Sequence, residues 1–221
     1  GARYNRVGGS SATTRNLISG NGEDGVDIGM SGTMSNTVIG NYIGTDASGS
    51  AALPNAFNGI CIDGGASANR IGGLTQASEN LIAYNEAHGI AIHDAATHGN
   101  ALLRNRIHSN GYLGIDLGGD GVTPNDKLDI DDGPNALQNF PVLLTVITDT
   151  FTTTVRGRLH SVPSTTFTLR FFSSPGCDAS GHGEGQDFLG MRVVETDDRG
   201  NVYFRVELES AVPEGHFVAA T

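Results

Sequence analysis

The sequence carries Asn5-Arg6-Val7-Gly8-Gly9 near its start and repeats it, 64 residues later, as Asn69-Arg70-Ile71-Gly72-Gly73. The same spacing relates Asn16-Leu17-Ile18 to Asn80-Leu81-Ile82, with no insertion or deletion between the two copies. Self-similarity at a fixed spacing is the sequence mark of an architecture in which one structural unit stacks on the next. The echo therefore predicts a repeat fold, and it predicts it for the first part of the chain.

Shorter segments, in which apolar and polar residues alternate, make up the 64-residue echo. The first kind reads Gly-x-x-Ile or Gly-x-x-Leu and occurs at Gly25–Ile28, Gly59–Ile62, Gly89–Ile92 and Gly114–Leu117. The second kind begins at Asn36, Asn69 and Asn100, and the third carries Ile18, Ile43, Ile82 and Ile107. Alternation with a period of two is typical of short strands, and Asn and Gly suit the turns between them. Three short strands that return in sequence predict a solenoid with three faces.

Asparagines recur at equivalent turns of these segments. They are Asn16, Asn21, Asn36, Asn41, Asn80, Asn85, Asn100 and Asn105. We interpret them as structural residues whose side-chain amides stack and bond from one repeat to the next. A β-sandwich is the alternative for this half of the chain, but it offers no reason for a gap-free echo. The many glycines and β-branched residues disfavour helices.

Three runs carry a resemblance to a known family: Asn16–Asn21, Ile39–Gly49 and Asn80–Asn85. They resemble the right-handed parallel β-helix repeats of bacterial extracellular proteins, the pectate-lyase-like superfamily. The resemblance covers about residues 1–119 and implies an all-β, right-handed parallel β-helix of about four coils. It implies no single activity, because the superfamily includes polysaccharide lyases, hydrolases, epimerases, esterases, phage tailspikes and inert adhesin stalks.

The repeat pattern stops after residue 119, and a different organisation is expected beyond it. Residues 120–139 are acidic and rich in Gly and Pro, which indicates a cap and linker. From residue 140 to 221 apolar residues alternate in about six segments, most regularly at Val202, Phe204, Val206 and Leu208. Strands at this spacing predict an immunoglobulin-like β-sandwich whose last strand is truncated. The runs Asn139–Leu143 and Phe171–Asp178 resemble the small β domains that follow β-helices in secreted bacterial proteins.

Composition and charge exclude several classes of partner. The 221 residues carry a formal net charge of −11, which argues against nucleic acid and anionic membranes as partners. No apolar run approaches the roughly 20 residues of a membrane-spanning helix, so we expect no membrane insertion. Cys61 and Cys177 lie far apart and are interpreted as two unpaired thiols, although a single bridge remains the alternative. Both ends of the sequence suggest a fragment of a longer protein.

Candidate catalytic residues follow from stacking the Gly-x-x-Ile segments. Stacking directs Asp27, Cys61, Ala91 and Asp116 outward at one position, and Asp63 and His93 two positions further along, with Asp94 beside them. Neighbouring strands lie about 4.8 Å apart, so a carboxylate and an imidazole on adjacent strands suit acid–base chemistry on a sugar. We take Asp63, His93, Asp94 and Asp116 as the candidates. A solvated face is the alternative, because no catalytic motif of the lyase, polygalacturonase, methylesterase or epimerase families is present.

A candidate calcium site lies in the acidic segment that follows the repeats. Six oxygen-bearing side chains fall within thirteen residues: Asp120, Asn125, Asp126, Asp129, Asp131 and Asp132. Calcium prefers such oxygen ligands and takes six to eight of them. The spacing only partly resembles a known calcium loop, and an acidic linker that needs no metal is the alternative.

Two classes of function remain open. The first is a non-catalytic structural, adhesive or glycan-binding module of a secreted or cell-surface bacterial protein, with polysaccharide or cell-surface glycan as its partner. The second is a carbohydrate-active enzyme of the lyase, hydrolase or epimerase type, or a fragment of one. A deep groove walled by the loop at residues 45–57 would favour the enzyme, whereas a flat face with regular asparagine ladders would favour the module. Assembly through exposed solenoid ends is a third, weaker alternative.

Overall fold

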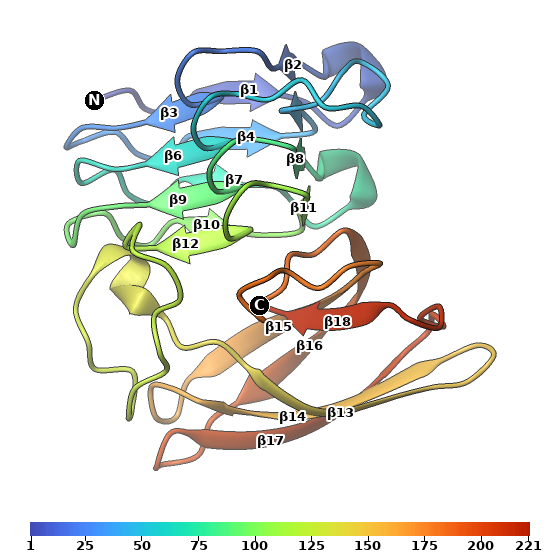
Figure 1. Ribbon diagram of the computed structural model, residues 1–221. Coiled ribbons are helices and arrows are strands. Elements are labelled where there is room, and N and C mark those ends of the chain that lie inside the picture. Colours follow the sequence, from blue (N-terminus) through green and yellow to red (C-terminus); the bar gives the residue numbers. More distant parts are fainter. The chain divides into compact units, whose positions relative to one another are not determined.

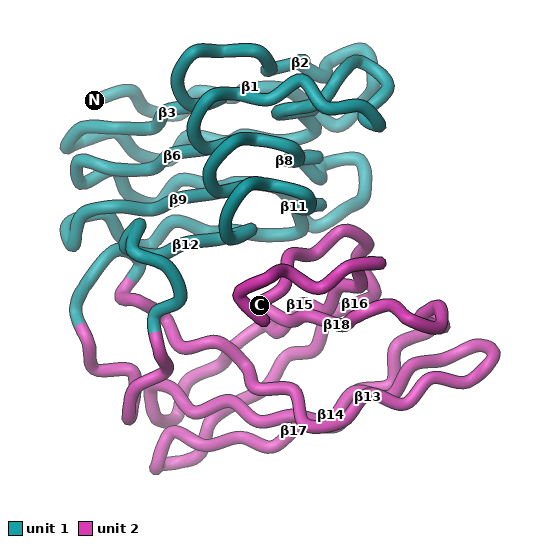
Figure 2. Tube along the Cα trace, viewed as in Figure 1, with its two compact units in different colours: residues 1–123, 132–135 teal, residues 124–131, 136–221 magenta.

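The computed structural model describes residues 1–221 and is nearly all β, as predicted, with three short 3-10 helices. The chain divides into two compact units, residues 1–123 with 132–135 and residues 124–131 with 136–221 (Figure 2). The segment predicted as a linker therefore contributes residues to both units. No helix is long and apolar enough to cross a membrane.

Three parallel sheets of four strands each form the first unit (Figure 1). Sheet 1 contains β1 (Arg6–Gly8), β4 (Thr37–Ile39), β7 (Arg70–Ile71) and β10 (Ala101–Leu102). Sheet 2 contains β2 (Leu17–Ile18), β5 (Tyr42–Ile43), β8 (Leu81–Ala83) and β11 (Arg106–His108). Sheet 3 contains β3 (Val26–Ile28), β6 (Ile60–Ile62), β9 (Ile90–Ile92) and β12 (Ile115–Leu117). The chain visits the sheets in turn, and we call each set of three consecutive strands a rung. This arrangement fits a β-helix or another solenoid.

The 64-residue echo spans two rungs rather than one. Arg6 and Arg70, which are equivalent in the echo, both align with Thr37 of the intervening strand β4. The corners between sheets 1 and 2 explain the double period. On the first and third rungs the corner is long and contains η1 (Ala12–Thr14) or η2 (Gln76–Ser78), whereas on the second and fourth rungs only a few residues connect the strands.

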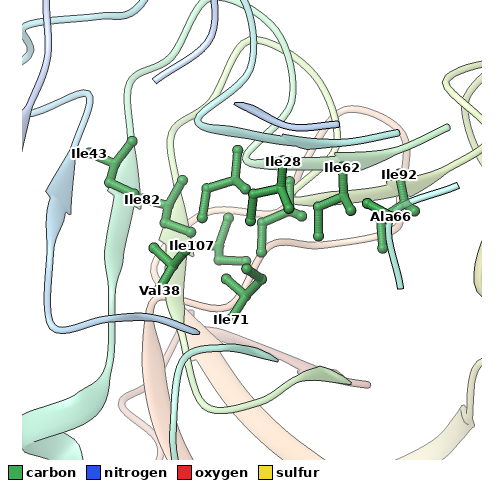
Figure 3. Close-up of a cluster of buried hydrophobic side chains, with 11 residues drawn as sticks. Ile28, Val38, Ile43, Ile62, Ala66, Ile71, Ile82, Ile92 and Ile107 are labelled. Carbon is green, nitrogen blue, oxygen red and sulfur yellow. The ribbon is translucent and has the colours of Figure 1, made fainter. Parts of the chain in front are cut away.

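Isoleucines fill the interior of the first unit, because each short strand directs alternate side chains inward (Figure 3). Ile60, Ile62, Ile90 and Ile92 are completely buried. Full burial of such a side chain contributes about 1.5–3 kcal/mol relative to leaving it exposed. The stacked isoleucines thus supply the main driving force for stacking the rungs.

Three ladders of asparagine side chains run along the corners, as predicted. The first contains Asn5, Asn36, Asn69, Asn100 and Asn135. The second contains Asn16, Asn41, Asn80 and Asn105, and the third contains Asn21, Asn55, Asn85 and Asn110. The side-chain oxygen in one rung accepts hydrogen bonds from the asparagine of the preceding rung. Asn135 ends the first ladder, which explains why residues 132–135 belong to the first unit.

Two three-stranded antiparallel sheets form the second unit. Sheet 4 contains β13 (Val142–Thr148), β14 (Thr153–His160) and β17 (Asn201–Leu208). Sheet 5 contains β16 (Asp187–Glu195), β15 (Thr166–Ser174) and β18 (Phe217–Ala220). Both sheets contribute to one buried cluster, which includes Val155, Phe171 and Phe204. The remaining helix, η3, spans Pro134–Leu137.

Candidate functional site

The outer face of sheet 3 carries the row predicted from the Gly-x-x-Ile segments. Asp27, Cys61, Ala91 and Asp116 align on neighbouring strands, and the isoleucines that flank Cys61 and Ala91 point into the core. Only Asp27 is exposed, because Cys61, Ala91 and Asp116 retain 6%, 0% and 1% of their accessible surface. The alternative of a solvated face is therefore wrong for three of the four residues, because surrounding residues cover Cys61, Ala91 and Asp116. Asp27 is thus the one residue of the row that meets solvent.

Asp116 is buried because the chain folds over its carboxylate. One oxygen accepts a hydrogen bond from Gly119 N at 3.0 Å, and the other accepts one from Gly121 N at 3.0 Å. His88 Nε2 lies 3.4 Å from Asp116 Oδ2, and the His88 side chain is only 15% exposed. Burial lowers the pKa of His88, against the opposing effect of the Asp116 charge, so the neutral imidazole is favoured. The result is a buried His–Asp pair.

His88 was not among the candidates, although the sequence holds a signal for it. A polar residue directly precedes the glycine of three Gly-x-x-Ile segments, at Asp24, Asn58 and His88. These residues form a short ladder of their own. Asn58 N donates to Asp24 Oδ1 at 2.7 Å, and His88 N donates to Asn58 Oδ1 at 3.1 Å. The recurrence of a polar residue at this position is what sequence reasoning could have used.

The other three candidate catalytic residues lie on the turns that follow the strands of sheet 3. Asp94 has a φ of +65° and accepts a hydrogen bond from Gly64 N at 2.9 Å, so it stabilises a turn. His93 Nδ1 lies 3.3 Å from the Gly118 carbonyl oxygen. No hydrogen bond joins Asp63 to His93. The structure therefore does not assemble these residues into an acid–base pair.

Negative charge gathers at the first-rung end of this face. Burial raises the pKa of Asp27, and the nearby Asp63 and Asp24 carboxylates raise it further. Burial, together with these carboxylates and Asp94, raises the pKa of Cys61 to about 12. Cys61 is therefore a protonated thiol at neutral pH and a poor nucleophile. Both cysteines are free, as predicted, with Cys61 buried and Cys177 exposed.

The second unit holds a compact acidic cluster, Asp126, Asp129 and Asp131, with one carboxylate oxygen of each within 4.8 Å of the others. Asp129 has a φ of +56°, and its carboxylate accepts hydrogen bonds from Asn139 N and the Ser161 hydroxyl. Asp126 Oδ2 accepts a hydrogen bond from Ile130 N at 3.1 Å. These contacts hold two of the three carboxylates in place.

Asp131 differs from its two neighbours, because its Oδ1 atom is buried and has no hydrogen-bond partner. Burial raises the pKa of Asp131, and the charges of Asp126 and Asp129 raise it further. An unpaired buried oxygen among carboxylates is costly unless a cation or proton compensates it. The cluster thus has the donor chemistry for a hard cation such as calcium.

The other residues of the predicted calcium set do not join this cluster. Asn125 exchanges two hydrogen bonds with the Phe140 backbone, one through its amide nitrogen and one through its oxygen. Asp120 and Asp132 are exposed and belong to the first unit. Three of the six predicted residues therefore come together.

The molecule also contains two cavities, one in each unit. One of about 560 Å³ lies in the first unit, between the long corners that contain η1 and η2. Another of about 300 Å³ lies in the second unit and is lined by Asp126, Arg158, His160, Asn201 and Tyr203, among others. Neither is lined by Asp63, His93, Asp94 or Asp116.

The loop at residues 45–57 was expected to wall a groove if the protein were an enzyme. It begins instead with a compact turn around Asp46, whose Oδ1 atom accepts hydrogen bonds from Ser50 N and Ala51 N. The Ser48 hydroxyl lowers the pKa of Asp46, and these backbone donors add to that effect. The bonds close this turn on itself.

Comparison with protein-family models gives no match, and comparison with curated proteins gives no significant match.

Proposed function

We propose that the chain is a non-catalytic structural and glycan-binding module of a secreted or cell-surface bacterial protein. Its first unit is proposed to be a right-handed parallel β-helix of about four coils of the pectate-lyase-like type. Its second unit is proposed to be an immunoglobulin-like sandwich. The observation that carries this proposal is the set of three asparagine ladders that run through every rung.

The ladders support a mechanical or presenting role because they are continuous and are buried on the second and third rungs. Asn41, Asn69 and Asn80 are completely buried, and the side-chain amide nitrogen of each donates to the asparagine oxygen of the next rung. Buried polar networks in which every member is satisfied make a structure rigid and unique. A rigid column with regular faces suits a stalk that holds a glycan-binding surface away from the cell.

The arrangement of the predicted catalytic residues favours binding over catalysis. Asp94 holds a turn, Asp116 is buried beneath the backbone of Gly119 and Gly121, and Asp63 makes no hydrogen bond to His93. Most glycoside hydrolases use two carboxyl groups that flank the bond to be cleaved. Among the four candidates, Asp94 and Asp116 already accept backbone hydrogen bonds, so neither carboxylate is free to act with Asp63.

Affinity gel electrophoresis on a panel of neutral and acidic polysaccharides tests the proposal, with new chain ends counted by mass spectrometry in the same samples. We expect retardation by at least one polysaccharide and no new chain ends. Chain cleavage by the purified protein would overturn the non-catalytic assignment. Absence of retardation on every polysaccharide would overturn the glycan-binding assignment.

A carbohydrate-active enzyme is the second candidate, and the buried His88–Asp116 pair is the observation that favours it. A histidine held by a buried carboxylate is a common general base. If the enzyme assignment is correct, cleavage must disappear in the His88→Gln variant. It must persist in His98→Gln, which changes an exposed histidine outside the pair.

We also propose that the acidic cluster of the second unit binds calcium. The unpaired, buried Oδ1 atom of Asp131 among the Asp126 and Asp129 carboxylates supports this proposal. Calcium there would stabilise the segment that leads into sheet 4.

A further inference from the structure

The cavity of about 560 Å³ in the first unit is a groove between two equivalent corners. Ser10, Ser11 and Ala12 line it from the first rung, Thr75, Gln76 and Ala77 from the third, and Gly40 of the second rung lies between them. Figure 1 shows the two short helical turns, η1 and η2, one above the other on the same side of the unit. The groove exists because the second-rung corner is short and leaves a gap between two long corners.

Gly40 keeps this gap open. It has a φ of +67°, and a Cβ atom there would lie 1.8 Å from the Gly9 carbonyl oxygen. No residue with a side chain fits at this position without moving the corner. The centre of the groove is therefore bare backbone.

The 64-residue echo supplies an internal comparison for the groove. Arg15 and Gly40 are equivalent to Glu79 and Arg104 on the third and fourth rungs. There the corner is closed by an ion pair between Glu79 and Arg104. In the groove, the charged residue on the long corner is Arg15, but the position that faces it is Gly40, which offers no side chain to pair with it.

Arg15 is held ready in the groove without an anionic partner. Its guanidinium carbon lies 3.9 Å from the centre of the Tyr42 ring, and it makes no hydrogen bond or ion pair. Stacking on an aromatic ring orients an arginine while leaving its N–H groups free to donate. Glu79 is the other charged residue of the lining, and Arg104 already compensates it. Arg15 is therefore the uncompensated charge of the groove.

Neutral polar groups complete the lining. The Ser10 hydroxyl and the Gln76 amide are exposed and form no hydrogen bond within the chain, whereas the Ser11 and Thr75 hydroxyls bond within their own corners. A volume of about 560 Å³ falls within the range of small-ligand sites. Free hydroxyl and amide groups beside one arginine match a ligand rich in hydroxyls that carries one negative charge.

We propose that this groove binds an anionic sugar unit, whose carboxylate or sulfate pairs with Arg15 as Glu79 pairs with Arg104 in the equivalent corner. The inference rests on the proposed glycan-binding function and places that binding between η1 and η2, away from sheet 3. Ser10 and Gln76 bond the sugar hydroxyls. The anionic group of the ligand would thus supply the partner that Arg15 lacks within the chain.

Isothermal titration calorimetry with short oligosaccharides tests this site. One set ends in a uronate, a second in a sulfated sugar, and a third in the neutral sugar of the same stereochemistry. We expect an acidic set to bind at least tenfold more tightly than its neutral counterpart, and the comparison of uronate with sulfate identifies the anion. Equal affinity for acidic and neutral sugars would overturn the proposal.

Two variants locate the binding. Arg15→Ala should weaken binding of the acidic sugar at least tenfold, because a charge-assisted hydrogen bond is lost. Ala77→Trp should weaken it by filling the groove without a change of charge. Arg156→Ala, which removes an equal charge from the exposed face of the second unit, should leave the affinity unchanged.

The outcomes separate this site from the broader function. Acidic sugars that bind equally well to wild type and Arg15→Ala would overturn the groove while leaving glycan binding in place. Absence of binding to every oligosaccharide, with the polysaccharide retardation described above intact, would likewise overturn the groove alone. Absence of both would overturn the groove and the glycan-binding function together.

Discussion

His88 is a residue whose protonation the fold opposes. Burial lowers its pKa below the ordinary 6.5, so at pH values below 6.5 the unfolded chain binds this proton more readily than the folded chain does. The free energy of unfolding should therefore decrease as the pH falls from 6.5 toward the lowered pKa. Above 6.5 this contribution to the pH dependence should vanish.

Urea unfolding at several pH values between 5.5 and 7.5 measures this effect. His88→Gln should show a weaker decrease in stability with falling pH than wild type, because the neutral amide takes up no proton. His98→Gln is the matched control, since His98 is exposed, and it should follow wild type. Parallel pH curves for wild type and His88→Gln would contradict the prediction.

Asp131 tests the cation proposal from a single side chain. Because the pKa of Asp131 is raised in the folded protein, protonation of this carboxyl adds to the free energy of unfolding below pH 3.8. That contribution is lost as the pH rises through the folded-state pKa. At pH 7 without calcium, Asp131→Asn should therefore be at least as stable as wild type. Calcium should raise the melting temperature of wild type, with a stabilisation of about 2.7 kcal/mol at a hundred times the dissociation constant.

Differential scanning fluorimetry with calcium or EDTA compares the variants. Asp131→Asn should lose most of the calcium response, whereas Asp120→Asn and Asp132→Asn should keep it because both residues are exposed and outside the cluster. Equal melting temperatures of the wild-type protein in calcium and in EDTA would overturn the proposal that the acidic cluster binds calcium.

The asparagine ladder is the element whose integrity most affects the first unit. Asn80 is completely buried, accepts hydrogen bonds from Asn41 and donates to Val38 O and Asn105 Oδ1. Asn80→Ala leaves several buried groups unpaired, each at about 1–3 kcal/mol, so we expect a loss of about 2–4 kcal/mol after relaxation.

Asn16 provides the matched comparison, because it occupies the same ladder on the first rung and is exposed. Asn16→Ala should lower the free energy of unfolding by less than about 1 kcal/mol. Chemical denaturation monitored by circular dichroism measures both. Similar losses for the two variants would mean that the ladders do not act through buried hydrogen bonds.

These elements also show how far the sequence predicts the structure. The sequence predicted the strand positions because the alternation of apolar residues and the turn residues are local signals. Strands β3, β6, β9 and β12 begin directly after the predicted glycines. The cover over Cys61 and Asp116 did not follow, because it depends on how neighbouring turns fold. The role of Asn135 at the end of a ladder could not be predicted either, because Asn135 lies outside the repeats.

The candidate sites were less predictable than the strands, for a related reason. Closeness in sequence suggested six calcium ligands, but Asn125 bonds to the Phe140 backbone and only three carboxylates converge. The groove beside Arg15 carries no motif at all. It results from alternating corner lengths and one glycine, Gly40, which become meaningful only when the rungs are stacked.

At the scale of the molecule, two separate buried clusters predict two separate unfolding events. Ile62 belongs to the cluster of the first unit, Phe171 belongs to that of the second, and both are completely buried. Ile62→Ala should cost about 2–5 kcal/mol and Phe171→Ala about 3–5 kcal/mol. In differential scanning calorimetry each variant should shift a different transition. A single transition shifted equally by both would show one cooperative unit.

The hydrogen bonds of the asparagine ladders have a direction. Every side-chain hydrogen bond between two asparagines of a column runs from the amide nitrogen to the amide oxygen of the next rung, so these bonds share one direction in all three columns. Aligned dipoles polarise one another, and the two ends of such a column are not equivalent. Asn5, Asn16 and Asn21 end their columns with oxygen atoms that accept nothing within the chain. The columns therefore give the first unit a direction: any group that is to extend them at the first rung must donate hydrogen bonds to these oxygens, whereas the opposite end of each column calls for an acceptor.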